Sequence, residues 1–310
     1  MSKTAYIFPG QGSQAVGMGK DLFDNFAAAR EVFEAADEAL GFSLSEMCFS
    51  GDEADLQLTA NTQPAILTAS VAAFEAARDE GLPIPHYVAG HSLGEYSALV
   101  AAGVLDFADA VRTVRKRGTY MQEAVPVGVG AMAAILGLDV DAIELGCVEA
   151  AQGQICSPAN INSPSQVVIA GNVEAIDRAC EILKQKGAKR AIKLNVSAPF
   201  HCVLMMPAQA RLEQDLIGLE YGAFAFPILH NFDAEVNNAA STVYGKLTAQ
   251  VSSRVQWLQT IEKMAASGVD KFIEIGPGKV LTGLVRQINR EAIYSNIENT
   301  TSLRNTLETL

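Results

Sequence analysis

Cysteine and histidine are scarce in this sequence of 310 residues. The five cysteines are odd in number and include no Cys-x-x-Cys pair. We therefore expect reduced, unpaired thiols in a cytoplasmic protein, since disulfides are rare in that compartment. The four histidines leave few choices for any reaction that needs an imidazole base.

Basic residues and long apolar runs are also in short supply. Lysine and arginine number 23 against 35 acidic residues, which gives a net charge of −12. A body this acidic repels phosphate backbones, so a general nucleic-acid binder is not expected. The longest uncharged stretch, residues 150–173, is rich in polar residues and glycine, so we expect no membrane span. The first residues lack the apolar region of a signal peptide, and none is expected.

The order of the apolar patterns predicts an α/β fold with a discontinuous large domain. Residues 1–125 alternate short apolar runs with longer helical patterns, which is typical of a parallel sheet covered by helices. Residues 126–197 instead follow the order strand, helix, strand, strand, helix, strand of a ferredoxin-like unit. The first rhythm resumes over 198–310. We therefore expect a small ferredoxin-like domain inserted into a large α/β domain.

Three elements of this pattern have expected bounds that depend on local signals. Apolar periodicity predicts one helix over 21–40 that ends before Gly41. A second helix is expected over 64–78, with Asn61-Thr62 as its cap and proline near its start. A strand over 190–196 is expected to close the small domain.

The clearest catalytic signal is Gly-His-Ser-Leu-Gly at 90–94, which matches G-x-S-x-G between a predicted strand and a predicted helix. Glycines permit a sharp turn that exposes the serine oxygen. The helix N-terminus and the next backbone N–H favour a developing oxyanion. The alternative is an ordinary glycine-rich turn. In this context we interpret Ser92 as a nucleophile.

A nucleophilic serine needs a base, and the four histidines are the candidates. His91 adjoins the serine on the same turn and is expected to point elsewhere, while His86 lies at the far end of the short strand. His201 and His230 each adjoin an apolar run, where the active-site groups of α/β sheets gather. The residues alone favour His201 only modestly, and a structural role stays open for either.

The glycine-rich turn at 10–15, Gly-Gln-Gly-Ser-Gln-Ala, follows a predicted strand and fits a dinucleotide fingerprint. A dinucleotide-binding unit should continue into a second strand that ends in an acidic residue about 20 residues later. The pattern over 21–40 is helical instead. We therefore interpret the turn as a place where a backbone N–H or the Gln11 amide approaches a reacting group.

Arg117 is the basic residue nearest the interior on the helix predicted over 109–124. With about 100° per residue, Arg117 lies about 70° from the centre of the apolar stripe. A partly buried arginine needs an anion, from the protein or from a substrate carboxylate. The alternative is an edge arginine whose stem packs along the stripe.

The turn motifs belong to a longer series in a fixed order. The series is Phe-Pro-Gly-Gln-Gly-Ser-Gln at 8–14, Gly-His-Ser-Leu-Gly-Glu-Tyr at 90–96, Gln-Val-Val-Ile-Ala-Gly at 166–171 and Gly-Pro-Gly at 276–278. These motifs resemble those of the malonyl-CoA:acyl carrier protein transacylases of bacterial-type fatty-acid synthesis. The resemblance covers nearly the whole chain. It implies a large α/β hydrolase-like domain with a ferredoxin-like insert, in agreement with the pattern above.

The resemblance also implies roles at the site. Ser92 would be the nucleophile and His201 the base. The backbone N–H groups of Gln11 and Leu93 would form the oxyanion hole. Arg117 would bind the malonyl carboxylate.

Two further features come from the resemblance alone. A main-chain carbonyl would orient the histidine, and Gln250 occupies that position. The family often has Asn-Pro before Val-Gln-Trp, whereas this chain has Ser253-Arg254, so the loop near Gln250 is expected to differ in shape. Phe200 before the histidine resembles malonyl-selective rather than methylmalonyl-selective acyltransferases.

The implied activity is transfer of malonyl from malonyl-CoA to the phosphopantetheine thiol of acyl carrier protein through a seryl acyl-enzyme, in a ping-pong sequence. No metal or redox cofactor is expected. Three alternatives are a serine hydrolase or thioesterase, an acyltransferase of polyketide synthesis, and a non-catalytic module that binds carrier protein. Retention of serine, histidine and arginine together argues against the last.

A basic segment is the candidate docking surface for the carrier protein. Acyl carrier proteins are acidic as a family, so a chain with a net charge of −12 needs a local patch of opposite sign. Arg115 and Lys116 are the second choice, and a solvated helix end is the alternative. The first choice is the run of five basic residues within ten positions, Lys184, Lys186, Lys189, Arg190 and Lys193.

Overall fold

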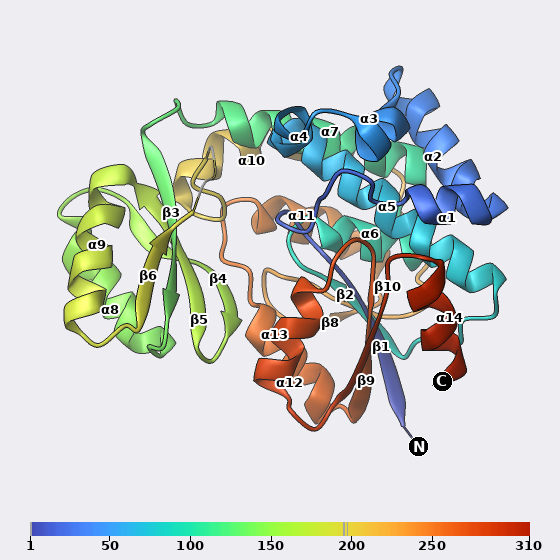
Figure 1. The fold of residues 1–310 in the computed structure, drawn as a ribbon. Helices are drawn as coiled ribbons and strands as arrows, with labels where there is room; N and C mark the ends of the chain where they lie inside the picture. Colours follow the sequence, from blue (N-terminus) through green and yellow to red (C-terminus); the bar gives the residue numbers. More distant parts are fainter. Residues whose placement is uncertain (1, 195, 197) are drawn as a thin grey trace.

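The larger of two sheets is built around β1 (Figure 1). The computed structural model describes residues 2–194, 196 and 198–310. The strand order is β10-β9-β1-β2-β7-β8, with parallel pairing except between β7 and β8. The strands are β1 (Lys3–Phe8), β2 (Tyr87–Gly90), β7 (Ile228–Leu229), β8 (Val236–Asn237), β9 (Val269–Ile275) and β10 (Ile293–Ile297).

Strand β1 is buried on both faces, which explains its continuous apolar run. Ala5 and Ile7 pack on one face with the cluster that includes Trp257, whereas Tyr6 and Phe8 pack on the other. Successive side chains of a strand point to opposite faces, so four consecutive apolar residues serve two separate cores. This strand therefore holds the turns that follow β1 and β2 at a fixed place in the molecule.

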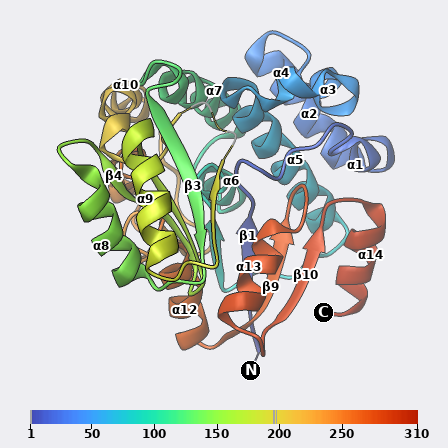
Figure 2. The same ribbon diagram turned by 60° about the vertical axis from the view of Figure 1, so that its left-hand side comes forward.

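The smaller sheet is antiparallel, with the order β4-β5-β3-β6. Its elements follow the predicted sequence of strand, helix, strand, strand, helix, strand. Helices α8 and α9 cover the face turned away from the rest of the molecule (Figures 1 and 2). The elements are β3 (Gly130–Leu136), α8 (Val140–Ala151), β4 (Cys156–Ser163), β5 (Gln166–Asn172), α9 (Val173–Gln185) and β6 (Arg190–Lys193).

Backbone hydrogen bonds join the smaller sheet to the larger body. The N–H of Ile161 donates to the carbonyl of Val255 at 2.9 Å, and the N–H of Val255 donates to the carbonyl of Ala159 at 2.8 Å. Val255 lies just before α12, which packs on the larger sheet. The two sheets are thus held together by main-chain bonds close to the glycine-rich turns.

Helices surround the larger sheet. They are α1 (Lys20–Asn25), α2 (Ala27–Leu40), α3 (Leu44–Ser50), α4 (Glu53–Gln57), α5 (Thr59–Asp79), α6 (Gly94–Ala101), α7 (Phe107–Glu123), α10 (Met206–Ile217), α11 (Val243–Gln250), α12 (Trp257–Ala266), α13 (Val280–Ile288) and α14 (Thr300–Glu308), with short 3₁₀ turns η1 (Val203–Met205) and η2 (Ala240–Thr242). Among the residues that the structure describes, no helix is long and apolar enough to cross a membrane.

The prediction of a single helix over 21–40 is wrong, because the helix is interrupted at Phe26. That residue is extended, with φ −127° and ψ 125°. In the last turn of α1, the side-chain amide of Asn25 donates to the carbonyl of Asp21 at 2.7 Å. Periodicity alone did not reveal this break, since apolar residues continue through it.

The prediction that α5 starts near Pro64 is also wrong, because the helix begins at Thr59. Asn61 and Thr62 do not cap it, since their side chains bind the carbonyls of Asp55 and Leu56 at 2.7 and 2.6 Å. Pro64 therefore lies inside the helix, where it has no N–H to give to the carbonyl of Ala60. That carbonyl instead accepts from Arg115 Nη1 of α7 at 2.9 Å.

Strand β6 is shorter than the predicted 190–196, since it ends at Lys193. Leu194 still donates its N–H to the carbonyl of Met132 at 2.9 Å, whereas Asn195 lies outside the described residues. All five cysteines are described, and all five carry free thiols.

Candidate active site

Ser92 lies on a tight turn between β2 and α6, and glycine is required on both sides of it. A Cβ at Gly90 would lie 1.9 Å from the carbonyl carbon and oxygen of Gly94, and one at Gly94 would lie 2.0 Å from the carbonyl oxygen of Phe8. Ser92 itself has φ +52°, in the left-handed region that side chains rarely adopt. The backbone is thus folded sharply enough to project the serine hydroxyl out of the turn.

Asn231 holds this turn from the neighbouring strand. Its Oδ1 accepts from the N–H of Ser92 at 2.5 Å, and its Nδ2 donates to the carbonyl of Gly90 at 2.7 Å. Strands β2 and β7 are parallel neighbours, so the residues that follow them meet at one edge of the sheet. A fully buried amide therefore fixes the strained backbone on which the serine is presented.

The hydroxyl of Ser92 meets the imidazole of His201. Ser92 Oγ and His201 Nε2 are 2.7 Å apart, and His201 Nδ1 is 2.9 Å from the carbonyl oxygen of Gln250. That carbonyl only accepts, so Nδ1 carries the proton and Nε2 is the free acceptor. Gln250 is the last residue of α11, where carbonyls lack helical partners and the helix dipole is negative.

The surroundings of His201 keep its imidazole neutral. Burial is the larger cause and the charge of Arg117 the second, and together they lower the pKa of His201 to about 3. Its backbone, like that of Ser92, is left-handed, with φ +59°. A neutral imidazole with a free Nε2 beside a hydroxyl is the arrangement that general-base chemistry needs.

Arg117 is almost fully buried, with an exposed fraction of 1%, and its guanidinium points at the same hydroxyl. Its Nη2 lies 3.1 Å from Ser92 Oγ. Nη1 donates to Gln63 Oε1 at 2.7 Å, and Nη2 also donates to Gln250 Oε1 at 2.9 Å. Its Nε has no partner among the described residues. The partners of the guanidinium are thus neutral oxygens, and a buried cation in this state favours an added anion.

A cavity of about 790 Å³ opens onto these groups. It is lined by Ser92, Arg117 and His201 together with Gln11 and Phe200. Both glycine-rich turns contribute to the lining, through Gln11 and Gly12 of the first and Ser92 of the second, since the turns follow the parallel neighbours β1 and β2. The cavity has the size of a small-molecule site with a few convergent polar groups.

The sequence left His201 and His230 open as partners of the serine, and the structure separates them. His230 is fully buried, and its Nδ1 lies 2.6 Å from Glu95 Oε1 rather than at the hydroxyl. His86 accepts from the N–H of Thr4 at 3.2 Å, at the far end of β2 as expected. His91 Nε2 lies 2.9 Å from Asn162 Oδ1, so this ring points away from the serine.

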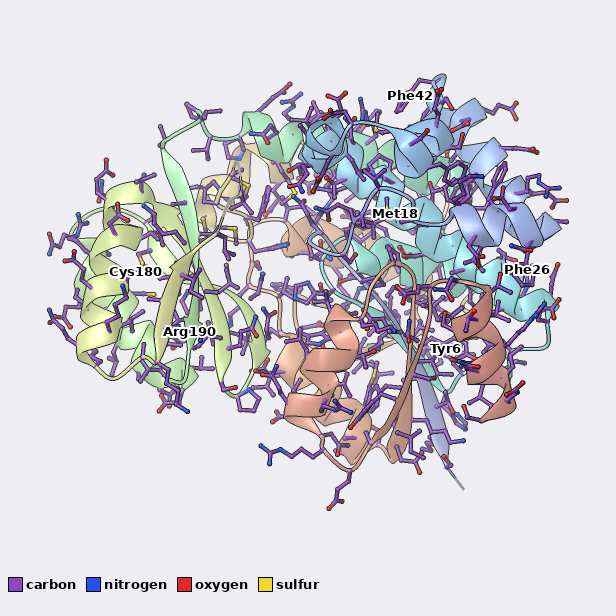
Figure 3. All side chains as sticks on the ribbon, in the orientation of Figure 1. Tyr6, Met18, Phe26, Phe42, Cys180 and Arg190 are labelled. Carbon is purple, nitrogen blue, oxygen red and sulfur yellow. The ribbon has the colours of Figure 1, made fainter. Side chains whose placement is uncertain are left out.

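Most of the predicted basic segment lies away from the cavity, although Lys193 directly precedes Leu194, which lines it. Arg190 pairs with Leu136 in the smaller sheet, whereas the cavity is lined by Met132 and Leu194 at the opposite end of the same strands. Leu194 lies four positions beyond Arg190, which corresponds to about 13 Å along extended backbone. Figure 3 labels Arg190 on this smaller sheet.

Three polar residues of the site were not singled out from the sequence. Gln63 and Asn231 hold Arg117 and Ser92, and Glu95 binds Gln250 through Oε2 and Nε2 at 2.9 Å. Only Glu95 gave a local signal, since it follows the G-x-S-x-G turn directly. Gln63 and Asn231 lie on distant segments that only the fold brings to the serine.

Comparison with known proteins shows the family of this chain. The family model described as acyl transferase domain matches residues 5–305. The chain is 50% identical over 288 residues to the malonyl CoA-acyl carrier protein transacylase of Escherichia coli K12, which covers 93% of each chain. It is 47% identical over 311 residues to the protein of that name from Bacillus subtilis, covering 100% of this chain and 98% of the relative.

Solved structures give the same result. An acyl carrier protein S-malonyltransferase from Vibrio cholerae matches with a TM-score of 0.96 and 47% identity, over 98% of this chain and 100% of that one. A malonyl-transacylase in complex with a type II PKS acyl-carrier protein matches with a TM-score of 0.97 and 47% identity over 100% of both chains. The chain therefore belongs to the acyl transferase family and is an acyltransferase of the malonyl CoA-acyl carrier protein transacylase type.

Proposed function

We propose that this acyltransferase moves malonyl from malonyl-CoA to the phosphopantetheine thiol of acyl carrier protein through a seryl acyl-enzyme, and so supplies malonyl-carrier for fatty-acid elongation. One observation carries the proposal. The Ser92 hydroxyl lies 2.7 Å from the free Nε2 of His201 and 3.1 Å from Nη2 of buried Arg117. Nucleophile, base and carboxylate receptor thus meet at one oxygen.

In the first half-reaction, His201 Nε2 takes the Ser92 proton while Oγ attacks the thioester carbonyl. The imidazolium that forms is stabilised by the Gln250 carbonyl at the negative end of α11. The C–S bond then breaks, and the leaving sulfur of coenzyme A takes the proton from Nε2. In the second half-reaction the carrier thiol attacks the seryl ester, and the same proton transfers run in reverse.

The developing oxyanion is stabilised by the backbone N–H groups of Gln11 and Leu93. Leu93 immediately precedes α6, so its N–H lies at the positive end of that helix. The N–H of Ser92 is not available for this role, because Asn231 already accepts from it. Gln11 lines the cavity on the turn after β1.

Arg117 holds the malonyl carboxylate in both half-reactions, through a bidentate pair of charged hydrogen bonds. Burial is the main cause that lowers the pKa of Arg117, and the charges of Tyr96 and Glu95 act against it. Phe200, exposed by only 8%, lines the same cavity and limits the space beside the acyl group.

Incubation with malonyl-CoA, with and without carrier protein, tests the proposal. A transacylase forms a malonyl adduct on Ser92 and then malonyl-carrier, as mass spectrometry would show. Rapid release of free malonate would instead identify a hydrolase. The absence of both adduct and malonate would leave only a binding module.

The pH dependence of serine acylation should show the environment of His201. We expect acylation by a neutral reagent, p-nitrophenyl acetate, to persist down to about pH 5, because a lowered pKa keeps the base form present in acid. An ordinary histidine base loses activity as the pH falls through about 6.5. In Arg117→Gln the acid limb should move to higher pH, since one cause of the lowering is removed. A wild-type acid limb near pH 6.5 would contradict this.

We also propose a division of the chain. Residues 1–125 and 198–310 would form an α/β hydrolase-like domain, and 126–197 an inserted ferredoxin-like domain. The separate antiparallel sheet, with its order β4-β5-β3-β6, supports the second unit. In that sheet β5, the third strand of the unit, lies between β3 and β4, the first two.

The basic segment of the smaller domain stays our proposed docking surface for carrier protein. Two of its members pair with acidic neighbours, since Lys186 binds Glu149 at 3.0 Å and Lys193 binds Asp177 at 2.5 Å. The remaining three, Lys184, Lys189 and Arg190, are exposed and able to face an acidic partner.

Reversal of charge at Lys189 and Arg190 should raise the KM for carrier protein, and the effect should shrink as salt rises. Lys20→Glu on α1 serves as the control, because it makes the same change of charge outside the basic segment, at a lysine that pairs with Asp24. Steady-state kinetics at low and high salt measure both. An unchanged KM in low salt would show that docking lies elsewhere, with Arg115 and Lys116 next to be tested.

A further inference from the structure

Glu95 is a fully buried carboxylate directly behind the serine turn. It lies in the first turn of α6 with an exposed fraction of 0%. Its Oε1 lies 2.6 Å from His230 Nδ1. Its Oε2 accepts from the backbone N–H of Asn231 at 2.8 Å and from Gln250 Nε2 at 2.9 Å. All three contacts are with groups that can donate, as a carboxylate acceptor requires.

A further hydrogen bond determines which ring nitrogen of His230 carries the proton. Asn237 Oδ1 accepts from the N–H of Ala239 at 2.9 Å, so the Nδ2 of this amide faces His230 Nε2, at 2.9 Å. Nε2 is therefore the acceptor, and the proton sits on Nδ1, where it points at Glu95. In this network His230 thus donates to Glu95 through Nδ1.

A fully buried carboxylate needs hydrogen-bond donors, and Glu95 has three. One of these donors sets the orientation of the Gln250 side chain. Its Nε2 donates to Glu95 Oε2 and to the carbonyl of Ser92, at 2.9 and 3.0 Å. The amide oxygen is thereby turned to Arg117, whose Nη2 it accepts at 2.9 Å.

The Oε2 atom thus joins two supports of the site. Through the backbone of Asn231 it holds the residue that fixes the Ser92 turn. Through the side chain of Gln250 it holds the guanidinium against the hydroxyl, while the main-chain carbonyl of the same residue contacts His201. One carboxylate oxygen is therefore linked to Ser92, Arg117 and His201, in each case through one intervening residue.

We propose that Glu95 is a positioning residue for malonyl transfer, which acts by orienting the Gln250 amide so that the Arg117 guanidinium is held where the malonyl carboxylate binds. The inference rests on the proposed roles of Ser92 and Arg117. Because the same carboxylate also holds the turn that presents Ser92, its loss should lower transfer of both acyl groups. The displaced Arg117 should lower transfer of an acidic acyl group further.

The test compares Glu95→Gln with the wild-type full chain in transfer of malonyl and acetyl from their CoA thioesters to carrier protein. Replacement keeps the size and removes the charge. We expect kcat/KM for malonyl to fall about 10- to 100-fold, the range for a hydrogen bond to a charged group. Acetyl transfer should fall less, so that the malonyl-to-acetyl preference drops at least about fivefold. An unchanged preference would overturn the inference.

Two further variants separate positioning from damage to the core. His230→Gln removes the contact on the other carboxylate oxygen, so it should lower stability yet keep the acyl preference. If it shifts the preference as much as Glu95→Gln does, packing is the cause and the inference fails. In a Gln250→Leu background, which keeps the main-chain carbonyl, Glu95→Gln should have little further effect on preference. An undiminished effect there would also overturn it.

If Glu95→Gln does not fold, Glu95→Asp applies the same test. Aspartate keeps the charge but withdraws the carboxylate from Gln250 by one methylene, so the preference should again fall, and an unchanged preference would refute the inference. A wild-type chain that forms no malonyl adduct would overturn the proposed function itself. Normal wild-type transfer together with normal Glu95 variants would overturn only the role of Glu95.

Discussion

Replacement of Ser92 by alanine is expected to abolish the malonyl adduct and to lower transfer to carrier protein by at least about 10⁴-fold. The change deletes the oxygen on which His201 and Arg117 converge, at 2.7 and 3.1 Å. The fold should persist, because alanine and serine tolerate the left-handed backbone at φ +52° about equally. Mass spectrometry after mixing with malonyl-CoA measures the adduct.

Ser97→Ala is the matched control for this change. Ser97 is a fully buried serine on α6, the helix that follows the Ser92 turn, and its hydroxyl has no partner among the described residues. The control should form the adduct at the wild-type rate. A malonyl adduct that persists in Ser92→Ala would place the nucleophile elsewhere.

Replacement of Arg117 by alanine should depress malonyl transfer by roughly 30- to 900-fold, while acetyl transfer changes little. The figure corresponds to roughly 2–4 kcal/mol for truncating one partner of a desolvated charge pair. The guanidinium has an exposed fraction of 1%, so little water screens its interaction with the carboxylate. The preference between the two acyl groups should thereby weaken or reverse, as competition between the two CoA thioesters would show.

Arg115→Ala is the matched control, because Arg115 lies on the same helix but donates to the carbonyl of Ala60 on α5. It should cost stability without changing the acyl preference. Arg117→Lys should recover only part of the malonyl rate, since an ammonium keeps the charge but not the planar pair of donors. Equal losses of malonyl and acetyl transfer in Arg117→Ala would show that this residue is structural.

Local patterns in the sequence were sufficient to predict part of this molecule. The order of elements over 126–197 is as predicted, because its helices and strands are bounded by turn or cap signals, as where Asp139 caps α8. The place of Arg117 near the apolar stripe predicted partial burial, with an edge arginine as the alternative, and the structure shows that it is almost fully buried. Ser92 could be singled out because its glycines lie beside it in the chain.

The remaining features depend on contacts between distant segments. His201 and His230 follow similar apolar runs, and only the neighbouring Glu95 shows why His230 is occupied elsewhere. Asn61 and Thr62 have the composition of a helix cap, yet they bind carbonyls of the preceding helix region. Polar side chains have several possible partners at similar free energy, and the fold decides among them.

The contact between His201 Nδ1 and the main-chain carbonyl of Gln250 affects which substitutions can inactivate the enzyme. Every amino acid has that carbonyl, so no single codon change at position 250 can delete the atom that orients the imidazole. Inactivating alleles are instead expected where substitutions move the end of α11, for example a proline placed within its last turn. In a deep mutational scan read out by acetyl transfer, which does not need Arg117, position 250 should therefore tolerate more amino acids than 92 or 201. The preceding turn of α11 should tolerate fewer than its distance from the serine suggests.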